Sequence, residues 1–161
     1  MALPKFKKAV VVRLASAVLA GAAGLMAFAG LTATPAQASG WRVTAAYNAQ
    51  CKGTGFFCLY YHPNVWLWGN NAEWSFNNYA PDLGQWKFDL CSGGGSGSCG
   101  GWNTYIRNNA ASMSAILCNG MTVWYYPNYT GNFNWIDGGS WGNLNSYLVN
   151  QEASTSKGNL C

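Results

Sequence analysis

The sequence predicts an all-β fold, a disulfide-bonded sandwich of two Greek-key motifs, and three observations lead to this prediction. Short aromatic or β-branched runs follow one another from Phe56 onward, separated by turn-forming segments such as "GNN", "APDLG", "CNG" and "DGGSWGN", which is the pattern of an all-β domain. No apolar stretch after residue 38 has the 3.6-residue spacing of a confident helix. One polar phrase is written twice, as "YIRNNAASM" at 105–113 and "YLVNQEAST" at 147–155.

The first 38 residues are expected to be a signal peptide. Four basic residues (Lys5, Lys7, Lys8, Arg13) precede an apolar run, and Ala36-Gln37-Ala38 has the small-x-small pattern that signal peptidase accepts. A transmembrane anchor is the alternative, because the run is long enough to span a bilayer. The cleavage pattern favours export, and we therefore expect a secreted, extracellular protein without a membrane partner. The predicted organisation is a signal peptide at 1–38, an N-terminal lead-in at 39–50 and one domain at 51–161.

Charge excludes one class of partner. The chain has nine basic and five acidic residues, and four of the basic ones lie in the predicted signal peptide. Five basic residues then remain against five acidic ones, so the mature chain carries no net charge. A nucleic-acid-binding surface needs a stripe of Lys and Arg facing the phosphates, and the mature chain has no such run. We expect no nucleic-acid partner.

All six cysteines lie in the predicted mature chain, which favours disulfides in an exported protein. Six cysteines allow 15 connectivities. Spacing favours two short loops, Cys51 with Cys58 and Cys91 with Cys99, which leaves Cys118 for Cys161. A zinc site is the competing interpretation, but no C-x2-C pair exists and His62 is the only histidine.

An internal repeat refines the fold. The segment "YYHPN", with "GNNAEW" behind it, at 60–74 returns as "YYPNYTGNFNW" at 125–135, and each copy is followed by one of the two polar phrases. The halves extend over about 58–113 and 118–155. The first half is longer because it contains the glycine-rich insertion around 91–99. Two units of this size can pair face to face as two Greek keys.

These motifs resemble a known family. The spacing from Trp124 to Gly131, followed by N-x-x-A-S, resembles the Greek-key signature of βγ-crystallin domains. An exported chain that opens with "CKGTGFFCLYY" is similar to the secreted actinobacterial peptidase inhibitors of this fold, a family known for metalloproteinase inhibition. The resemblance implies an inhibitor that blocks an extracellular peptidase with a rigid loop. The first key departs from the signature, because 65–68 displace its glycine, and no segment matches the family's reactive loop residue by residue.

Two segments are candidates for the inhibitory loop. One is the turn from Pro127 to Asn132. The other is the disulfide-closed loop, although its small side chains offer a peptidase pocket little to grip. Its residues are Ser92, Gly93, Gly94, Gly95, Ser96, Gly97 and Ser98.

The repeated phrase also resembles a calcium motif. Calcium-binding members of the crystallin-like group carry N/D-N/D-x-x-S/T-S, and the resemblance implies weak calcium ligands at Asn108, Asn109, Ser112, Asn150 and Ser154. Met113 replaces the last serine, and Gln151 departs at the second position of the second copy. Calcium prefers six to eight oxygens with carboxylate charge. A structural role is the favoured alternative, in which each serine ties its own hairpin to the backbone.

A weak calcium-binding structural protein is one alternative to an inhibitor. An enzyme is not expected, because His62 has no adjacent nucleophile pattern and five acids single out no catalytic pair. The other alternative to inhibition is a glycan-binding or cell-wall-binding module, or an antimicrobial one like the killer-toxin-like members of the crystallin group. It would use an exposed platform of Trp66, Trp68 and Trp74. Burial of these rings in the core is the competing interpretation.

Overall fold

The computed structural model describes residues 38–43, 46–47, 51–63, 70–92 and 99–158. All of them belong to one compact unit, Pro35–Cys161. The signal peptide predicted at 1–38 lies almost entirely outside the described residues and stays a prediction. Within the described part of the chain, no helix is long and apolar enough to cross a membrane.

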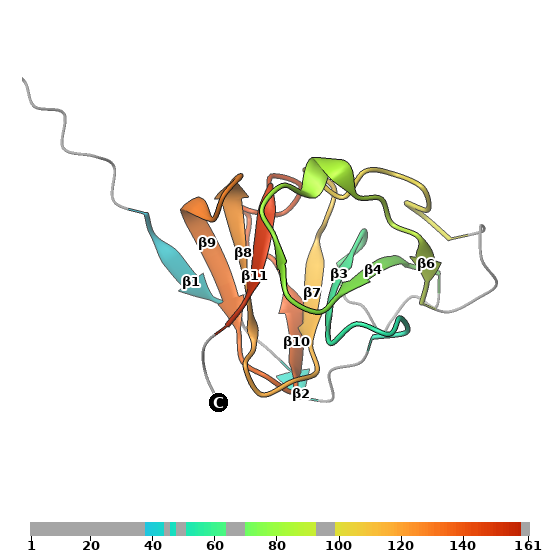
Figure 1. The fold of residues 1–161 in the computed structure, drawn as a ribbon, viewed down its shortest axis with the longest axis horizontal. Helices are drawn as coiled ribbons and strands as arrows, with labels where there is room; N and C mark the ends of the chain where they lie inside the picture. The colour runs from blue at the N-terminus through green and yellow to red at the C-terminus, as the bar shows by residue number, and fades with distance from the viewer. Residues whose placement is uncertain (1–37, 44–45, 48–50, 64–69, 93–98, 159–161) are drawn as a thin grey trace, which may run out of the picture. The chain divides into compact units, whose positions relative to one another are not determined.

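Strands make up two sheets, which Figure 1 shows as separate layers. The first sheet has the order β1-β9-β8-β11-β5. All its pairs are antiparallel except β1 with β9. Its strands are β1 (Gly40–Arg42), β5 (Tyr79–Ala80), β8 (Met121–Tyr126), β9 (Thr130–Ile136) and β11 (Ser154–Lys157).

The second sheet has the order β2-β10-β7-β3-β4-β6, and all its pairs are antiparallel. Its strands are β2 (Ala46–Tyr47), β3 (Phe57–Tyr60), β4 (Ala72–Phe76), β6 (Leu90–Cys91), β7 (Ser112–Ala115) and β10 (Ser140–Asn143).

The strand order shows two Greek keys that exchange one strand. In the first key β3, β4 and β7 share a sheet, whereas the third strand of that key, β5, pairs with β11 in the other sheet. In the second key β8, β9 and β11 share a sheet, and its third strand, β10, pairs with β7. Each sheet therefore needs a strand from the other half. The predicted all-β sandwich of two Greek keys is confirmed.

Alternating side chains fill the space between the sheets. In β8, Met121 and Val123 are buried whereas Thr122 and Trp124 are part-exposed, which is the period-two pattern of a strand with one face on a core. β3 is buried along its whole length because both of its faces are covered: Phe57 and Leu59 belong to the main core, whereas Cys58 and Tyr60 pack in a second cluster with Cys51 and Trp141. Val123, Ile136, Leu59 and Met113 belong to one continuous core cluster, so the two sheets share their interior.

The lead-in at 39–50 gives no strand signal in the sequence, yet it contributes β1 and β2 to the edges of the two sheets. Backbone hydrogen bonds to β9 and β10 help to fix these short strands, and backbone pairing cannot be predicted from the order of side chains. The only described helical element is a 3-10 turn, Leu83–Gln85, whose N-cap Asp82 accepts a hydrogen bond from the N–H of Gly84.

The structure confirms two predicted disulfides, Cys51–Cys58 and Cys91–Cys99. Cys118 is also disulfide-bonded. Its predicted partner, Cys161, lies outside the described residues, so that pairing stays a prediction. None of the described cysteines is free.

Candidate functional site

The two copies of the polar phrase lie against each other and make the same hydrogen bonds. We call 108–112 and 150–154 the paired loops. The Asn108 N–H donates to the carbonyl of Glu152, and the Asn150 N–H donates to the carbonyl of Ala110, each over 2.9 Å. Both asparagines adopt positive φ, 61° and 56°, a conformation that asparagine tolerates better than most residues. The repeat is therefore a pseudo-two-fold contact between the two keys.

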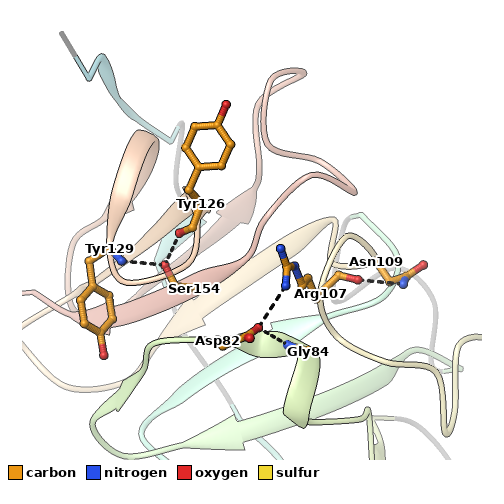
Figure 2. Close-up of polar contacts among 7 residues, drawn as sticks. All are labelled: Asp82, Gly84, Arg107, Asn109, Tyr126, Tyr129 and Ser154. Atoms are coloured by element: carbon orange, nitrogen blue, oxygen red, sulfur yellow. Dashed lines mark hydrogen bonds and ion pairs between the residues drawn. The ribbon is translucent and has the colours of Figure 1, made fainter. Parts of the chain in front are cut away.

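Each paired loop ends in a serine that ties down the hairpin of its own key. The Ser112 hydroxyl donates to the carbonyl of His62 over 2.7 Å. The Ser154 hydroxyl donates to the carbonyl of Tyr126 over 2.7 Å and accepts from the N–H of Tyr129 over 3.1 Å, as Figure 2 shows. Both serines are fully buried. The expected structural role of the repeated serine is thus confirmed in both keys.

The second of these hairpins, which we call the folded hairpin (126–131), has an unusually constrained backbone. Asn128, Tyr129 and Gly131 all adopt positive φ. A Cβ on Gly131 would lie 2.6 Å from the ring of Tyr126, so only glycine fits beneath that ring. Two more bonds close the turn, from the Thr130 hydroxyl to the carbonyl of Pro127 and from the Asn128 N–H to that of Pro81. The rings of Tyr126 and Tyr129 point in opposite directions (Figure 2).

Glu152 places a carboxyl group inside the contact between the paired loops. Its Oε1 accepts hydrogen bonds from the N–H groups of Asn109 (2.9 Å) and Ala110 (2.7 Å). The side chain is fully buried, and within the described part of the chain its Oε2 has no hydrogen-bond partner. Burial raises the pKa of Glu152 to about 8, although the backbone N–H groups partly oppose the shift. Sequence reasoning missed this residue, since nothing local shows that an acid in the repeat is buried.

The paired loops bring the predicted calcium ligands into two related sets. The Asn109 amide nitrogen donates to the carbonyls of Tyr105 and Arg107, which fixes the side chain within its own loop. Arg107 also forms an exposed ion pair with Asp82 (Figure 2). Ser112 and Ser154 each use their hydrogen in a hairpin bond and keep oxygen lone pairs. The buried carboxyl group of Glu152 lies between the two loops, but its pKa is raised to about 8, so near neutral pH it adds little of the carboxylate charge that calcium prefers.

The other predicted sites are placed only in part. Ser92 anchors one end of the disulfide-closed loop, because its N–H donates to the carbonyl of Asn71 over 2.8 Å. The other end is anchored by the Gly100 N–H, which donates to the carbonyl of Asn70 over 3.2 Å. Residues 93–98 lie outside the described residues.

The predicted tryptophan platform is wrong for Trp74. This side chain is only 5% exposed and stacks on Phe76 with ring centroids 4.7 Å apart. It belongs to the core because it lies on the inner face of β4, beside Phe57 and Leu59 of the same cluster. Trp66 and Trp68 lie outside the described residues, so their role stays untested.

A different aromatic row lies on the outer face of the first sheet. Trp124 and Phe133 are paired across β8 and β9 with ring centroids 4.5 Å apart, and Trp135 is paired with Thr122. Thr122, Phe133 and Trp135 also line a cavity of about 160 Å³. The alternation in "MTVWYY" places Trp124 opposite the buried Val123, so the sequence contained a signal for this row.

No protein-family model matches the sequence, and the comparison with curated proteins finds no match. Among solved structures, the chain is similar to one described as "Evolution of the eye lens beta-gamma-crystallin domain fold". The TM-score is 0.48, the sequence identity is 11%, and the alignment covers 73% of this chain and 100% of that chain. The fold assignment therefore rests on the strand order and on the reciprocal bonds of the paired loops.

Proposed function

We propose that the chain is a secreted inhibitor of an extracellular peptidase and that the folded hairpin is the segment it presents. The observation that carries the proposal is the side chain of Tyr126, which is 56% exposed on a turn fixed by four hydrogen bonds. Tyrosine is among the residues that most often dominate binding at protein interfaces. A turn that is already ordered loses little conformational entropy on binding, which favours affinity.

The backbone of the folded hairpin also suits a blocking role. Asn128 and Tyr129 are consecutive residues at positive φ, so this stretch is not extended. A peptidase cleft occupied by such a turn does not receive an extended strand to cleave. The disulfide-closed loop is the second segment within the same proposal, because the ladder bonds of Ser92 and Gly100 and the Cys91–Cys99 bridge fix both of its ends.

Titration of a peptidase with the mature chain tests the proposal. Residues 39–161 are added to a thermolysin-like metallopeptidase and to a subtilisin-like serine peptidase, and residual activity is measured against molar ratio. We expect stoichiometric loss with one class. Tyr126→Ala should weaken inhibition by about tenfold or more, which corresponds to about 1.4 kcal/mol.

Tyr105→Ala is the matched control, because Tyr105 is equally exposed (55%) and lies outside the folded hairpin. Equal inhibition by the two variants would show that Tyr126 does not contact the peptidase, and the disulfide-closed loop would then be the segment that binds it. Failure to inhibit either class at any ratio would remove the proposal.

Glycan binding is the second candidate, and the aromatic row of the first sheet favours it. Part-exposed indole rings beside the hydroxyl of Thr122 and the cavity of about 160 Å³ form a surface on which a sugar ring can stack and donate hydrogen bonds. A chitin and peptidoglycan pull-down separates the candidates. Retention that is lost in Trp135→Ala, without peptidase inhibition, would support this function in place of the first.

A further inference from the structure

The Cys51–Cys58 disulfide lies against a buried carboxyl group. Cys51, Cys58 and Glu73 place their ligand-type atoms within 4.8 Å of one another, and Glu73 Oε1 is 3.2 Å from the sulfur of Cys58. Both sulfurs are joined in the bridge, so neither has a proton to donate and neither is a thiolate that could hold a metal. A carboxyl group so close to a disulfide sulfur acquires a chemical role when the bridge opens.

The two cysteines of this bridge differ in burial. Cys58 is fully buried on β3, whereas Cys51 is only partly buried at the edge of the same small cluster. Cys51 is therefore the cysteine at which attack by an incoming thiolate is expected, with Cys58 as the leaving group. A thiolate at Cys58 would form in a desolvated site, where the charged form is costly unless a proton arrives with it.

Glu73 is the carboxyl group beside this sulfur, with its Oε1 3.2 Å from Cys58 Sγ. β4 carries Glu73 opposite Tyr60, and its side chain is only 1% exposed. Its Oε1 accepts from the N–H groups of Lys52 and Gly53 over 2.7 and 3.0 Å, so the carboxyl group is held against the loop that the disulfide closes. Burial raises the pKa of Glu73, and the backbone bonds from Gly53 and Lys52 only partly offset the effect. The charge of Lys52 also lowers the pKa, the charge of Asp89 raises it, and the buried hydroxyl group of Tyr60 interacts with the same carboxyl group. The carboxyl group thus keeps its proton closer to neutral pH than an exposed glutamate does.

We propose that Cys51–Cys58 is a thiol–disulfide exchange centre in which Glu73 protonates the departing sulfur of Cys58. A low-molecular-weight or protein thiolate attacks the sulfur of Cys51, and the Cys51–Cys58 bond breaks. A mixed disulfide forms at Cys51, the electron pair goes to Cys58, and the Glu73 proton converts that sulfur to a thiol. A second thiolate then releases Cys51 as a thiolate, and the attacking thiols leave as their own disulfide, so two electrons are transferred overall.

The second bridge supplies an internal control. Cys91 and Cys99 are both buried, 2% and 7% exposed, so neither sulfur offers an open line of attack. Among the residues that the structure describes, a cluster of sulfurs with a carboxylate occurs only at Cys51–Cys58. The two bridges should therefore differ in reactivity within the same folded molecule. This inference does not depend on peptidase inhibition.

Timed reduction tests the proposal. The mature chain is exposed to glutathione between pH 5 and 9, quenched by alkylation and mapped by mass spectrometry, and each rate constant is expressed per mole of thiolate. Cys51–Cys58 should open about tenfold faster than Cys91–Cys99, and its rate constant should fall as pH rises and Glu73 loses its proton. In Glu73→Gln the amide oxygen keeps the two backbone bonds, but no proton is available, so the rate should fall about tenfold and become independent of pH.

Two more variants exclude a purely structural role. Glu152→Gln alters the other buried glutamate and should leave both bridges unchanged. Glu73→Asp keeps a carboxyl group and should keep the pH dependence at a reduced rate, and it serves as the test if Glu73→Gln does not fold. Faster opening in Glu73→Gln would show that Glu73 only holds the loop, and a flat profile in the wild type or in Glu73→Asp would equally overturn the proposal.

Discussion

Replacing Glu152 by glutamine is expected to change how the stability of the fold depends on pH. The folded protein holds the Glu152 proton up to a pKa of about 8, whereas the ordinary value is 4.5. Between these two values the folded state binds more protons than the unfolded state, so stability falls as pH rises through this range. Below pH 4.5 the contribution of the protonated group is fully present, and above pH 8 it is lost. Glutamine keeps an acceptor oxygen for Asn109 and Ala110 but cannot titrate.

The magnitude follows from the burial of the carboxyl group. A pKa raised from 4.5 to about 8 corresponds to a ceiling of about 5 kcal/mol. Local opening that admits water reduces this figure, so we expect the wild type to lose at least about 1 kcal/mol relative to Glu152→Gln between pH 5 and pH 8.

Guanidinium unfolding of both proteins, followed by tryptophan fluorescence with the disulfides intact, measures the effect. The difference between the two free energies of unfolding at each pH isolates Glu152, because contributions shared by both proteins, including that of Glu73, cancel. A difference that stays constant from pH 5 to pH 8, or one that grows in favour of the wild type, would refute the assignment of a buried, proton-holding carboxyl group.

The serine hydrogen bonds to the hairpins and the paired loops give two more tests. Ser154→Ala removes a donor and an acceptor from a buried site and should lower the free energy of unfolding by about 1–3 kcal/mol; Ser112→Ala, which removes one such bond, should cost less, and equal losses would contradict the bond assignment. For weak calcium binding by the paired loops, a dissociation constant near 1 mM predicts about 1.4 kcal/mol of stabilisation at 10 mM calcium. Calorimetry with calcium, with magnesium as the control, should then show a raised Tm. An unchanged Tm would show that the paired loops do not bind calcium.

The fold was predictable because its sequence patterns are local and because one of them occurs in both keys. Turn chemistry divides the chain into short strands, and the repeated N-x-x-A-S phrase marks the loop that each key folds onto its hairpin. The edge strands β1 and β2 were not predictable, because they are short and pair with β9 and β10, which lie far away in the sequence; in β1, Trp41 also stacks on Tyr147 and Arg42 pairs with Asp137. Disulfide pairing followed from spacing for the two short loops, since residues seven and eight positions apart are readily brought together by a turn.

The candidate site was less predictable, because it depends on which face of a strand is buried. Alternation in β4 divides its side chains into two faces without saying which one meets the core, and Trp74 lies on the inner face. Alternation in β8 leaves Trp124 on the outer face. The burial of Glu73 and Glu152 is a property of the assembled sheets and loops, and no local pattern distinguishes these acids from the exposed Asp89.

Glu152 breaks the symmetry of the paired loops in a way that couples the two keys. Ala110 occupies the equivalent position in the first key, and its carbonyl makes the same 2.9 Å bond as that of Glu152. Greek-key geometry therefore does not require a carboxyl group at this position. The Glu152 side chain adds two bonds from the second key to the backbone of the first, over and above the reciprocal pair. β5 and β10 are also exchanged between the sheets. The folded hairpin is therefore held from both keys, by Ser154 of the second key and by the carbonyl of Pro81 in the first, which accepts from the Asn128 N–H over 2.8 Å.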